Sequence, residues 1–449
     1  MFYISDSAPL FLTGGRVIDP ANGVDSVADV LIEDGRIAAV GRSLGHPDGA
    51  RVVDVAGCAV APGFVDLHCH LREPGQEHKE TIQTGLAAAA AGGFTTVCCM
   101  PNTTPPLDDP ELVQAVLARG RAVSPVHLYV IAAISRGQQG MALAPLADLA
   151  AAGAVAFSDD GRPVWNEPLM RLALRASREL DIPLSLHEED PRLAAGGVMN
   201  AGRVSVQLGL HGLPAAAEEA MIARDTRLVA EEGGRIHIAH VSTARAVALV
   251  RAARERGLPV SGEATPHHLT LTEDLAARPW DGRPYDTRTK VNPPLRTRED
   301  VEALIEGVRD GTITAIATDH APHAASDKCC SYEEAAFGIS LFETALGSLC
   351  ELVHQGRLAL PLLVERLTRG PARLFGLDAG TLSVGAGADI VVFDPDEEWT
   401  VDASRFLSMG KNTPLDGATL RGRVRLTIAG GRAAFDRLGL LAPSQEPSR

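Results

Sequence analysis

The sequence is poor in cysteine and in positive charge, and both shortages narrow what the protein can be. Seven cysteines stand among 449 residues without a Cys-x-x-Cys pair, which argues against a disulfide scaffold and favours reduced thiols. Lysine and arginine together number 42 against 57 aspartate and glutamate residues, a formal net charge of -15. This balance argues against nucleic acid or a membrane surface as a partner and leaves a small molecule as the expected substrate.

Long apolar runs and a leader signal are also missing. The uncharged stretch at residues 81–107 is interrupted by Gly, Gln, Asn and Pro, so it predicts a buried helix and strand and no membrane span. The first residues lack a basic region followed by an apolar run, which predicts a cytoplasmic protein without a signal peptide. The sequence contains no His-Glu-x-x-His, Gly-x-Ser-x-Gly or Gly-Lys-Ser/Thr motif, which argues against those metal, nucleophile and phosphate-loop chemistries.

The chain does contain short extended segments near both ends, broken by Gly, Asp and Asn turns. They lie at residues 11–19, 30–40 and 51–55, and again at 388–394, 420–429 and 431–435. We expect the two ends to build one small β-sandwich domain together, from residues 1–60 and 376–440. Residues 441–449 are expected to form a flexible tail.

The middle of the chain alternates between apolar, strand-like runs and helical stretches rich in Ala, Leu, Arg and Glu. The expected strands are residues 63–66, 95–100, 126–134, 154–157, 183–186, 236–239, 260–263 and 313–318. Helices are expected at 167–180, 215–232 and 243–256, among others. Eight buried strands alternating with helices predict an α/β fold, a (β/α)8 TIM-like barrel over residues 61–375, with an open doubly wound sheet as the alternative.

Residues able to bind metal gather where these strands end, at the face where barrel enzymes assemble their sites. The candidates are His68 and His70 after the first strand, Asp159 and Asp160 after the fourth, His187 after the fifth, His240 after the sixth and Asp319 after the eighth. Side chains alternate along a strand, so His68 and His70 project to the same side and can hold one ion together. The isolated residues His46, His127, His211 and His354 are interpreted as surface or core histidines.

This ligand set is large enough for two divalent cations, and Zn²⁺ accepts such a mixture of nitrogen and oxygen ligands. Two metals would share a bridging carboxylate and a bridging water, which would lose a proton near neutral pH to give a hydroxide nucleophile. A neighbouring aspartate can then move the proton. Co²⁺ or Mn²⁺ would fit the same ligands.

Five separated motifs together resemble the class I dihydroorotases of the amidohydrolase superfamily. They are APGFVDLHCHLREPG at 61–75, MPNTTP at 100–105, TPHHL at 265–269, KVNPPLR at 290–296 and DHAPH at 319–323. The segment KNTPLDG from residue 411 is similar to the family's closing segment. The resemblance implies reversible hydrolysis of the cyclic amide of (S)-dihydroorotate to N-carbamoyl-L-aspartate, the third step of de novo pyrimidine (UMP) biosynthesis.

The resemblance also implies a role for each site residue. His68 and His70 would hold one Zn²⁺, His187 and His240 a second, and Asp160 would bridge them, giving two ions per subunit. Asp319 would bind metal, act as the general base and return the proton to the leaving nitrogen. The substrate would contact His70, its carboxylate would meet Arg72, Asn102 and His323, and its ring would meet Asn292 and the backbone of Phe337 and Gly338.

Several alternatives stay open from the residues alone. Arg72 could pair with Glu73, Asn102 and Asn292 could cap turns beside prolines, and Asp159 rivals Asp160 as the bridging ligand. His267 and His268 are expected to orient neighbours, and Cys69 is expected in the core. The segment 324–338 departs from the family's usual loop, with adjacent cysteines at 329 and 330, so closure and substrate preference are the least defined properties.

Related cyclic amidases that act on hydantoins, dihydropyrimidines or allantoin bridge their metals with a carboxylated lysine after strand four. The four lysines here are Lys79, Lys290, Lys328 and Lys411, so none is available at that point. A third hypothesis is a non-catalytic subunit of aspartate transcarbamoylase, but such chains lack the metal ligands that this sequence keeps. The family resemblance further implies a homo-oligomer, a dimer, that could associate with aspartate transcarbamoylase.

Overall fold

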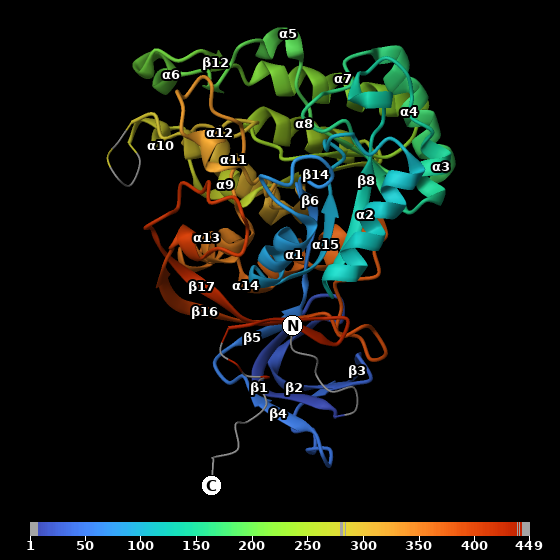
Figure 1. Cartoon of the computed structure of the whole chain (residues 1–449), viewed down its shortest axis with the longest axis vertical. Coiled ribbons are helices and arrows are strands. Elements are labelled where there is room, and N and C mark those ends of the chain that lie inside the picture. The colour runs from blue at the N-terminus through green and yellow to red at the C-terminus, as the bar shows by residue number, and fades with distance from the viewer. Residues whose placement is uncertain (1–7, 279–281, 283, 438, 440, 442–449) are drawn as a thin grey trace.

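The computed structural model describes residues 8–278, 282, 284–437, 439 and 441. Figure 1 shows a barrel wrapped in helices above and a β-sheet domain below. The expected start without a signal peptide falls on residues 1–7, and the expected tail falls on 441–449; apart from Leu441, both lie outside the described residues.

Eight parallel strands form the barrel sheet, which confirms the predicted barrel and rules against the open doubly wound sheet. In sheet order they are β6 (Phe64–Cys69), β7 (Phe94–Cys99), β8 (His127–Ala132), β9 (Ala154–Phe157), β10 (Leu184–Leu186), β13 (Ile236–Ile238), β14 (Val260–Ala264) and β15 (Ala315–Ile316). Each overlaps its predicted range. The residues after β15 close the ring, because Asp319 N donates to His68 O at 2.9 Å and His70 N donates to His320 O at 2.9 Å.

Helices surround the barrel and fill its connections. They are α1 (Ile82–Ala91), α2 (Pro110–Val123), α3 (Leu146–Ala151), α4 (Glu167–Leu180), α5 (Pro191–Ala194), α6 (Arg203–Leu208), α7 (Ala216–Glu232), α8 (Ala244–Glu255), α9 (Pro266–Thr270), α10 (Asp274–Ala277), α11 (Arg298–Asp310), α12 (Ala325–Lys328), α13 (Phe342–His354), α14 (Leu360–Leu367) and α15 (Arg369–Phe375). Short 3-10 turns lie at Arg136–Gln138, Thr287–Thr289 and Ala403–Arg405, and β11 (Met199–Asn200) pairs with β12 (Gly212–Leu213).

The ends of α4 follow from its sequence, and its bounds equal the predicted range. The Asn166 side chain accepts the Leu169 N–H and so satisfies one of the free donors of the first turn. Asp181 then takes a left-handed conformation, φ 54°, and ends the helix. The predicted helices at 215–232 and 243–256 are confirmed as α7 and α8. Helix α7 begins one residue later than predicted, and α8 is one residue shorter at each end.

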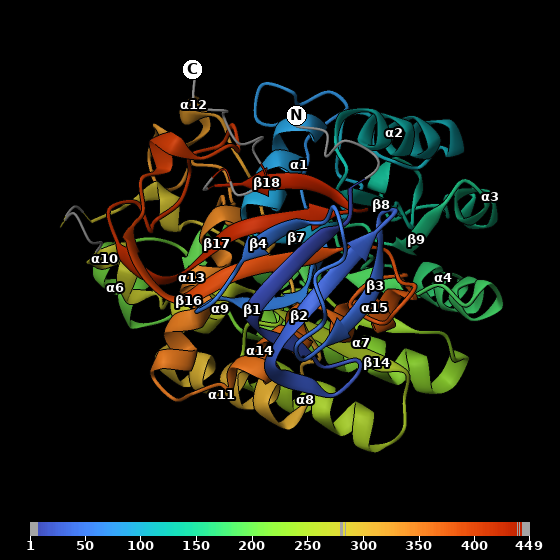
Figure 2. The same ribbon diagram turned by 90° about the horizontal axis from the view of Figure 1, so that it is seen from below.

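A second sheet of eight strands draws on both ends of the chain, which confirms the predicted second domain. Its strands are β1 (Leu10–Asp19), β2 (Val24–Glu33), β3 (Arg36–Gly41), β4 (Arg51–Asp54), β5 (Ala59–Pro62), β16 (Ile390–Thr400), β17 (Thr419–Ala429) and β18 (Arg432–Asp436). The two ends of the chain meet where β5 pairs antiparallel with β16. Seen from below in Figure 2, the helices of the barrel surround this sheet.

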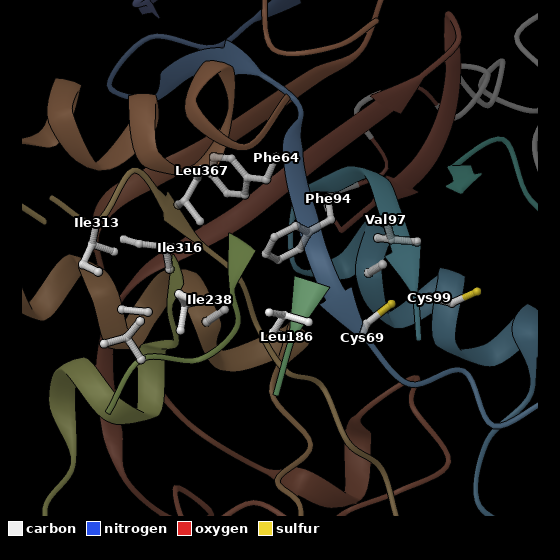
Figure 3. Packing of buried hydrophobic residues seen from close by; sticks show 14 of the residues in the cluster. Phe64, Cys69, Phe94, Val97, Cys99, Leu186, Ile238, Ile313, Ile316 and Leu367 are labelled. Carbon is white, nitrogen blue, oxygen red and sulfur yellow. The ribbon is translucent and has the colours of Figure 1, made fainter. Parts of the chain in front are cut away.

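The two domains share apolar packing. Phe64 on β6 meets Phe94 on β7 edge to face, with ring centroids 5.6 Å apart, and Figure 3 shows both rings within one cluster. Phe64 also lies 5.9 Å from the ring of Phe393 on β16, so the barrel core continues into the second sheet. Because β5 ends at Pro62 and β6 begins at Phe64, this sheet joins the amino end of the barrel strand, and the carboxyl end is left for the polar residues.

None of the helices in the described part of the chain has both the length and the apolar character needed to cross a membrane.

Candidate active site

Two clusters of potential metal ligands meet at one carboxylate. His68, His70 and Asp160 form the first cluster, and Asp160, His187 and His240 form the second, all of them buried. Asp160 Oδ1 lies 3.5 Å from His68 Nε2, 3.6 Å from His187 Nδ1 and 3.7 Å from His240 Nε2. The five residues come from four barrel strands, so the fold gathers them from segments far apart in the chain.

Asp319 lies against the first cluster. Its Oδ1 is 3.1 Å from His70 Nε2 and 3.5 Å from His68 Nε2. Asp319 and His240 both adopt positive φ, 48° and 33°, in the region that residues with a Cβ usually avoid. Such strain persists where surrounding contacts hold it, and it often marks a functional position.

The electrostatics of the clusters favour positive charge between the imidazoles. Burial opposes a charge on His68, but the carboxylates of Asp160, Glu263 and Asp319 raise its pKa to about 10. His187 is buried as well, and Asp160 and Glu189 raise its pKa to about 10. In return the histidines hold the pKa of Asp160 well below its usual range, despite the burial of this carboxylate.

The donor set fits a divalent cation. Within the described part of the chain, His68 Nε2, Asp160 Oδ1 and His240 Nδ1 are buried without a hydrogen-bond partner. His68 Nε2 and Asp160 Oδ1 face each other at 3.5 Å. Two ligands about 2.1 Å from one tetrahedral ion lie about 3.4 Å apart, so this spacing suits a shared metal.

The structure separates the two neighbouring aspartates. Asp160 points into both clusters. Asp159 is turned the other way, where its carboxylate accepts N–H groups from Ile134 at 2.9 Å and Ser135 at 3.0 Å, and the Ser135 hydroxyl. Burial raises the pKa of Asp159 to about 6. Asp159 thus anchors the 134–135 turn while Asp160 faces the histidines.

Glu263 on β14 is a site residue that sequence reasoning missed. It is fully buried, and its Oε1 lies 2.9 Å from His68 Nδ1. Its Oε2 lies 3.0 Å from His237 Nε2. These partners hold its pKa at about 2 in spite of burial, so the residue is a carboxylate. A charged residue inside a strand that is expected to be buried was the available signal.

The segment after His70 places a buried guanidinium beside the imidazole of His323. Arg72 is buried with φ 60°, and its Nε donates to Pro322 O at 3.2 Å. Its guanidinium Nη2 lies 3.3 Å from His323 Nε2. The suggested surface ion pair with Glu73 does not form, since Glu73 lies 3.4 Å from Arg119 and accepts the Ile82 N–H.

The two predicted asparagines lie at the clusters and cap no turn there. Asn102 Oδ1 is 2.9 Å from His70 Nδ1, and its Nδ2 donates to Asp160 Oδ2 at 3.0 Å. Asn292 Nδ2 donates to Glu189 at 2.9 Å and lies 3.4 Å from His187 Nε2. Asn292 Oδ1 is buried and lacks a partner among the described residues.

His323, Phe337 and Gly338 form one connected wall. His323 Nε2 lies 2.8 Å from Phe337 O, while Lys79 Nζ lies 3.4 Å from His323 Nδ1. His323 Nε2 thus lies between Phe337 O and the Arg72 guanidinium, and Nδ1 faces the Lys79 ammonium group. Gly338 has φ 143°, and a Cβ there would lie 2.7 Å from Ala321 O, so the position requires glycine.

Asn412, near the end of the chain, ties this wall together, and sequence reasoning gave it no role. Its Oδ1 accepts the His323 N–H at 2.9 Å. Its Nδ2 donates to Ala321 O and to Gly338 O, both at 3.0 Å.

The predicted core role of Cys69 agrees with its burial and with its thiol, which donates to Cys98 O. His268 is held by Thr265 and Pro293 O.

A parallel barrel with two histidine clusters sharing one aspartate at the carboxyl ends of its strands defines a metal-dependent hydrolase of the amidohydrolase superfamily. A family model described as dihydro-orotase-like matches residues 57–246. The dihydroorotase of Anaeromyxobacter sp. (strain K) is 53% identical over 427 residues, covering 95% of this chain and 98% of that protein. The dihydroorotase of Syntrophus aciditrophicus is 48% identical over 427 residues, covering 95% and 99%.

Among solved structures, an L-hydantoinase (dihydropyrimidinase) from Arthrobacter aurescens superposes with a TM-score of 0.84 at 27% identity, over 95% of this chain and 96% of that one. The chain belongs to the dihydroorotase family.

Proposed function

We propose that the protein is a dihydroorotase, which reversibly hydrolyses the cyclic amide of (S)-dihydroorotate to N-carbamoyl-L-aspartate. The observation that carries the proposal is the position of buried Arg72 beside two histidine–aspartate clusters. An amidase acting on an anionic ring needs both the hydrolytic centre and a cation for the ring's carboxylate. The reaction would serve the third step of pyrimidine biosynthesis.

The metal we propose is Zn²⁺, two ions per subunit, with Asp160 as the shared ligand. His68 and His70 would hold one ion and His187 and His240 the other, in keeping with the two clusters. When bound, such ions lower the pKa of coordinated water and polarise the amide carbonyl.

Asp319 is the proposed general base and a metal ligand. It sits at the carboxyl end of the last barrel strand with Oδ1 3.1 Å from His70 Nε2. Despite its burial, the surrounding histidines hold the pKa of Asp319 far below its usual range, so it starts as a carboxylate able to accept a proton. The same residue would return that proton to the ring nitrogen as the amide bond breaks.

The substrate carboxylate would meet Arg72, Asn102 and His323, and His70 would contact the substrate as well. A guanidinium binds a carboxylate through two parallel hydrogen bonds, which fixes orientation in addition to affinity. The ring would meet Asn292, whose Oδ1 has no partner among the described residues, and the backbone of Phe337 and Gly338. The rigid wall held by Asn412 supports this placement.

The likeness to a hydantoinase makes a related cyclic amidase the second candidate. It is less favoured because Asp160, and no lysine, lies at the meeting point of the clusters.

We further propose a homodimer that can associate with aspartate transcarbamoylase. Size-exclusion chromatography with light scattering tests the dimer, and co-purification of transcarbamoylase activity tests the association.

The decisive experiment is an assay of the purified, metal-loaded protein with L-dihydroorotate, with bound metal counted by elemental analysis. We expect ring opening with one to two zinc ions per chain. Faster turnover of an uncharged hydantoin than of dihydroorotate would replace the proposal with the cyclic amidase. Metal binding without turnover of either compound would contradict both.

A further inference from the structure

A cavity of about 500 Å³ lies away from the histidine clusters, between the second sheet and the side of the barrel. Its walls come from the end of α1, from α13, from β16, β17 and β18, and from residues 402–407. Figure 1 shows α13 above β16 and β17, and Figure 2 shows β17 and β18 passing beside α1. A volume of this size falls in the range of sites that hold small organic ligands.

The cationic part of the lining consists of Arg405, Arg423 and Arg437. Arg423 stacks on the ring of Trp399, 4.7 Å from its centroid, and pairs with Glu397 at 3.3 Å. Arg437 pairs with the same Glu397 at 2.6 Å. Arg405 makes no ion pair with any residue in the described ranges, so its guanidinium is available to an incoming anion.

The acidic side chains of the lining are already engaged. Glu343 on α13 accepts the N–H groups of Leu407 at 2.8 Å and Ser408 at 3.3 Å. Burial raises the pKa of Glu343 to about 7, which reduces its negative charge near neutral pH. Asp402 accepts N–H and O–H from Ser404. Asp402 keeps its charge, but three guanidinium groups outnumber the two carboxyl groups of the lining, so the lining can attract an anion.

Much of the remaining lining is apolar. Trp399, Phe406 and Phe435 line the cavity together with Leu346 and Val424. The Trp399 ring is held in place by the hydrogen bond from its Nε1 to Gly422 O at 3.1 Å. Aromatic walls of this kind favour a planar ring, because stacking adds to the apolar area that is buried.

We propose that this cavity is a binding site for a small aromatic anion of nucleoside-monophosphate size. Its planar ring lies among Trp399, Phe406 and Phe435, and its anionic group lies on Arg405. Neither the ring nor the anion takes part in the reaction proposed above.

One wall of the cavity continues into the substrate wall. Asp402, Arg405 and Phe406 line the cavity. Ser408 follows them in the chain, and its hydroxyl donates to Glu80 at 2.5 Å. Glu80 lies 3.8 Å from His320, the neighbour of Asp319. Four residues further on, Asn412 binds the His323 N–H. A ligand that shifts residues 402–407 therefore changes the support of the substrate wall, and we expect its occupancy to change KM.

Binding is tested on the full-length protein by isothermal titration calorimetry with adenosine monophosphate and uridine monophosphate. Adenosine, which lacks the charge, and inorganic phosphate, which lacks the ring, are the matched probes. We expect at least one monophosphate to bind with about one molecule per chain and about tenfold more tightly than either fragment. Arg405→Gln should weaken this binding about tenfold, because it removes the unpaired guanidinium from an exposed position.

Arg421→Gln is the control, since Arg421 lies on β17, pairs with Glu398 and does not line the cavity. It should leave nucleotide affinity unchanged. Absence of saturable binding by both monophosphates, or equal affinity in Arg405→Gln and wild type, would overturn the site. Saturating nucleotide should change KM for dihydroorotate at least about twofold, a readout that rests on the proposed function. If nucleotide binds and KM stays unchanged, the link between the cavity and the substrate wall is overturned and the binding site itself is retained.

Discussion

The carboxylate of Glu263 holds the imidazole of His68, with Oε1 2.9 Å from Nδ1, while its other oxygen lies 3.0 Å from His237. This contact leaves Nε2 of His68 facing Asp160. A carboxylate behind a metal-binding histidine fixes the tautomer and makes the free nitrogen a better ligand. Glu263 is therefore a positioning residue for the first cluster.

Glu263→Gln should weaken metal binding about 10- to 100-fold, because the amide keeps the shape of the side chain and loses its charge. Zinc competition with a coloured chelator measures the affinity directly and needs no substrate. Glu273→Gln is a matched control, since Glu273 is also buried but binds Asn200. Equal zinc affinity in Glu263→Gln and wild type would contradict this role.

Asp319→Asn should lower kcat at least about 100-fold, since an amide cannot accept the proton of the attacking water. Part of the metal should remain, because both clusters keep their other ligands. Steady-state rates and elemental analysis of the same sample test both statements. A variant with metal bound and the wild-type rate would remove Asp319 from the mechanism.

Arg72→Met should lower kcat/KM for dihydroorotate. The expected loss of transition-state stabilisation is about 2–4 kcal/mol, the value of a charge-assisted bidentate contact. Zinc content should stay at the wild-type level, because Arg72 contacts Pro322 and His323 and lies outside both clusters. Little change in kcat/KM would mean that Arg72 only supports the fold.

Asn412→Ala should raise KM more than it lowers kcat, because it releases His323 and Gly338 without touching the histidine clusters. The loss of three hydrogen bonds from a buried amide is expected to cost about 1–3 kcal/mol. Asn22→Ala, in the turn between β1 and β2, provides a control in the second domain. A pure loss of kcat with unchanged KM would argue against a positioning role.

Stability should respond to the titration of Glu343. Its folded pKa is raised from 4.5 to about 7 by burial, so the folded state binds the proton more tightly than the unfolded state. Its contribution to stability is therefore greatest below pH 4.5 and declines as pH rises to about 7. Relative to wild type, Glu343→Gln should gain about 3 kcal/mol of unfolding free energy as pH rises over that window, measured by urea unfolding. A pH-independent difference would contradict the assignment.

Much of the fold could be predicted from the sequence because its signals are local. The barrel strands are short, mostly buried runs that alternate with helical stretches, and α4 carries its own cap at Asn166. His68 and His70 could be paired in advance because side chains alternate along a strand. The choice between Asp159 and Asp160 was harder from local pattern, since adjacent residues at a strand end can turn either way.

The sequence by itself determined the alternation of strands and helices, the metal-binding residue types at the strand ends and the absence of a lysine between residues 79 and 290. Only the tertiary structure decided which partners those residues meet. Glu263 reaches His68 across 195 positions, and Asn412 reaches His323 across 89. Such contacts depend on how strands close into a barrel and where the chain returns, and a short-range pattern carries no record of either. The cavity lined by Trp399 and Arg405 has the same origin. Its walls come from α1 and α13 and from strands β16, β17 and β18, and these elements meet only after folding.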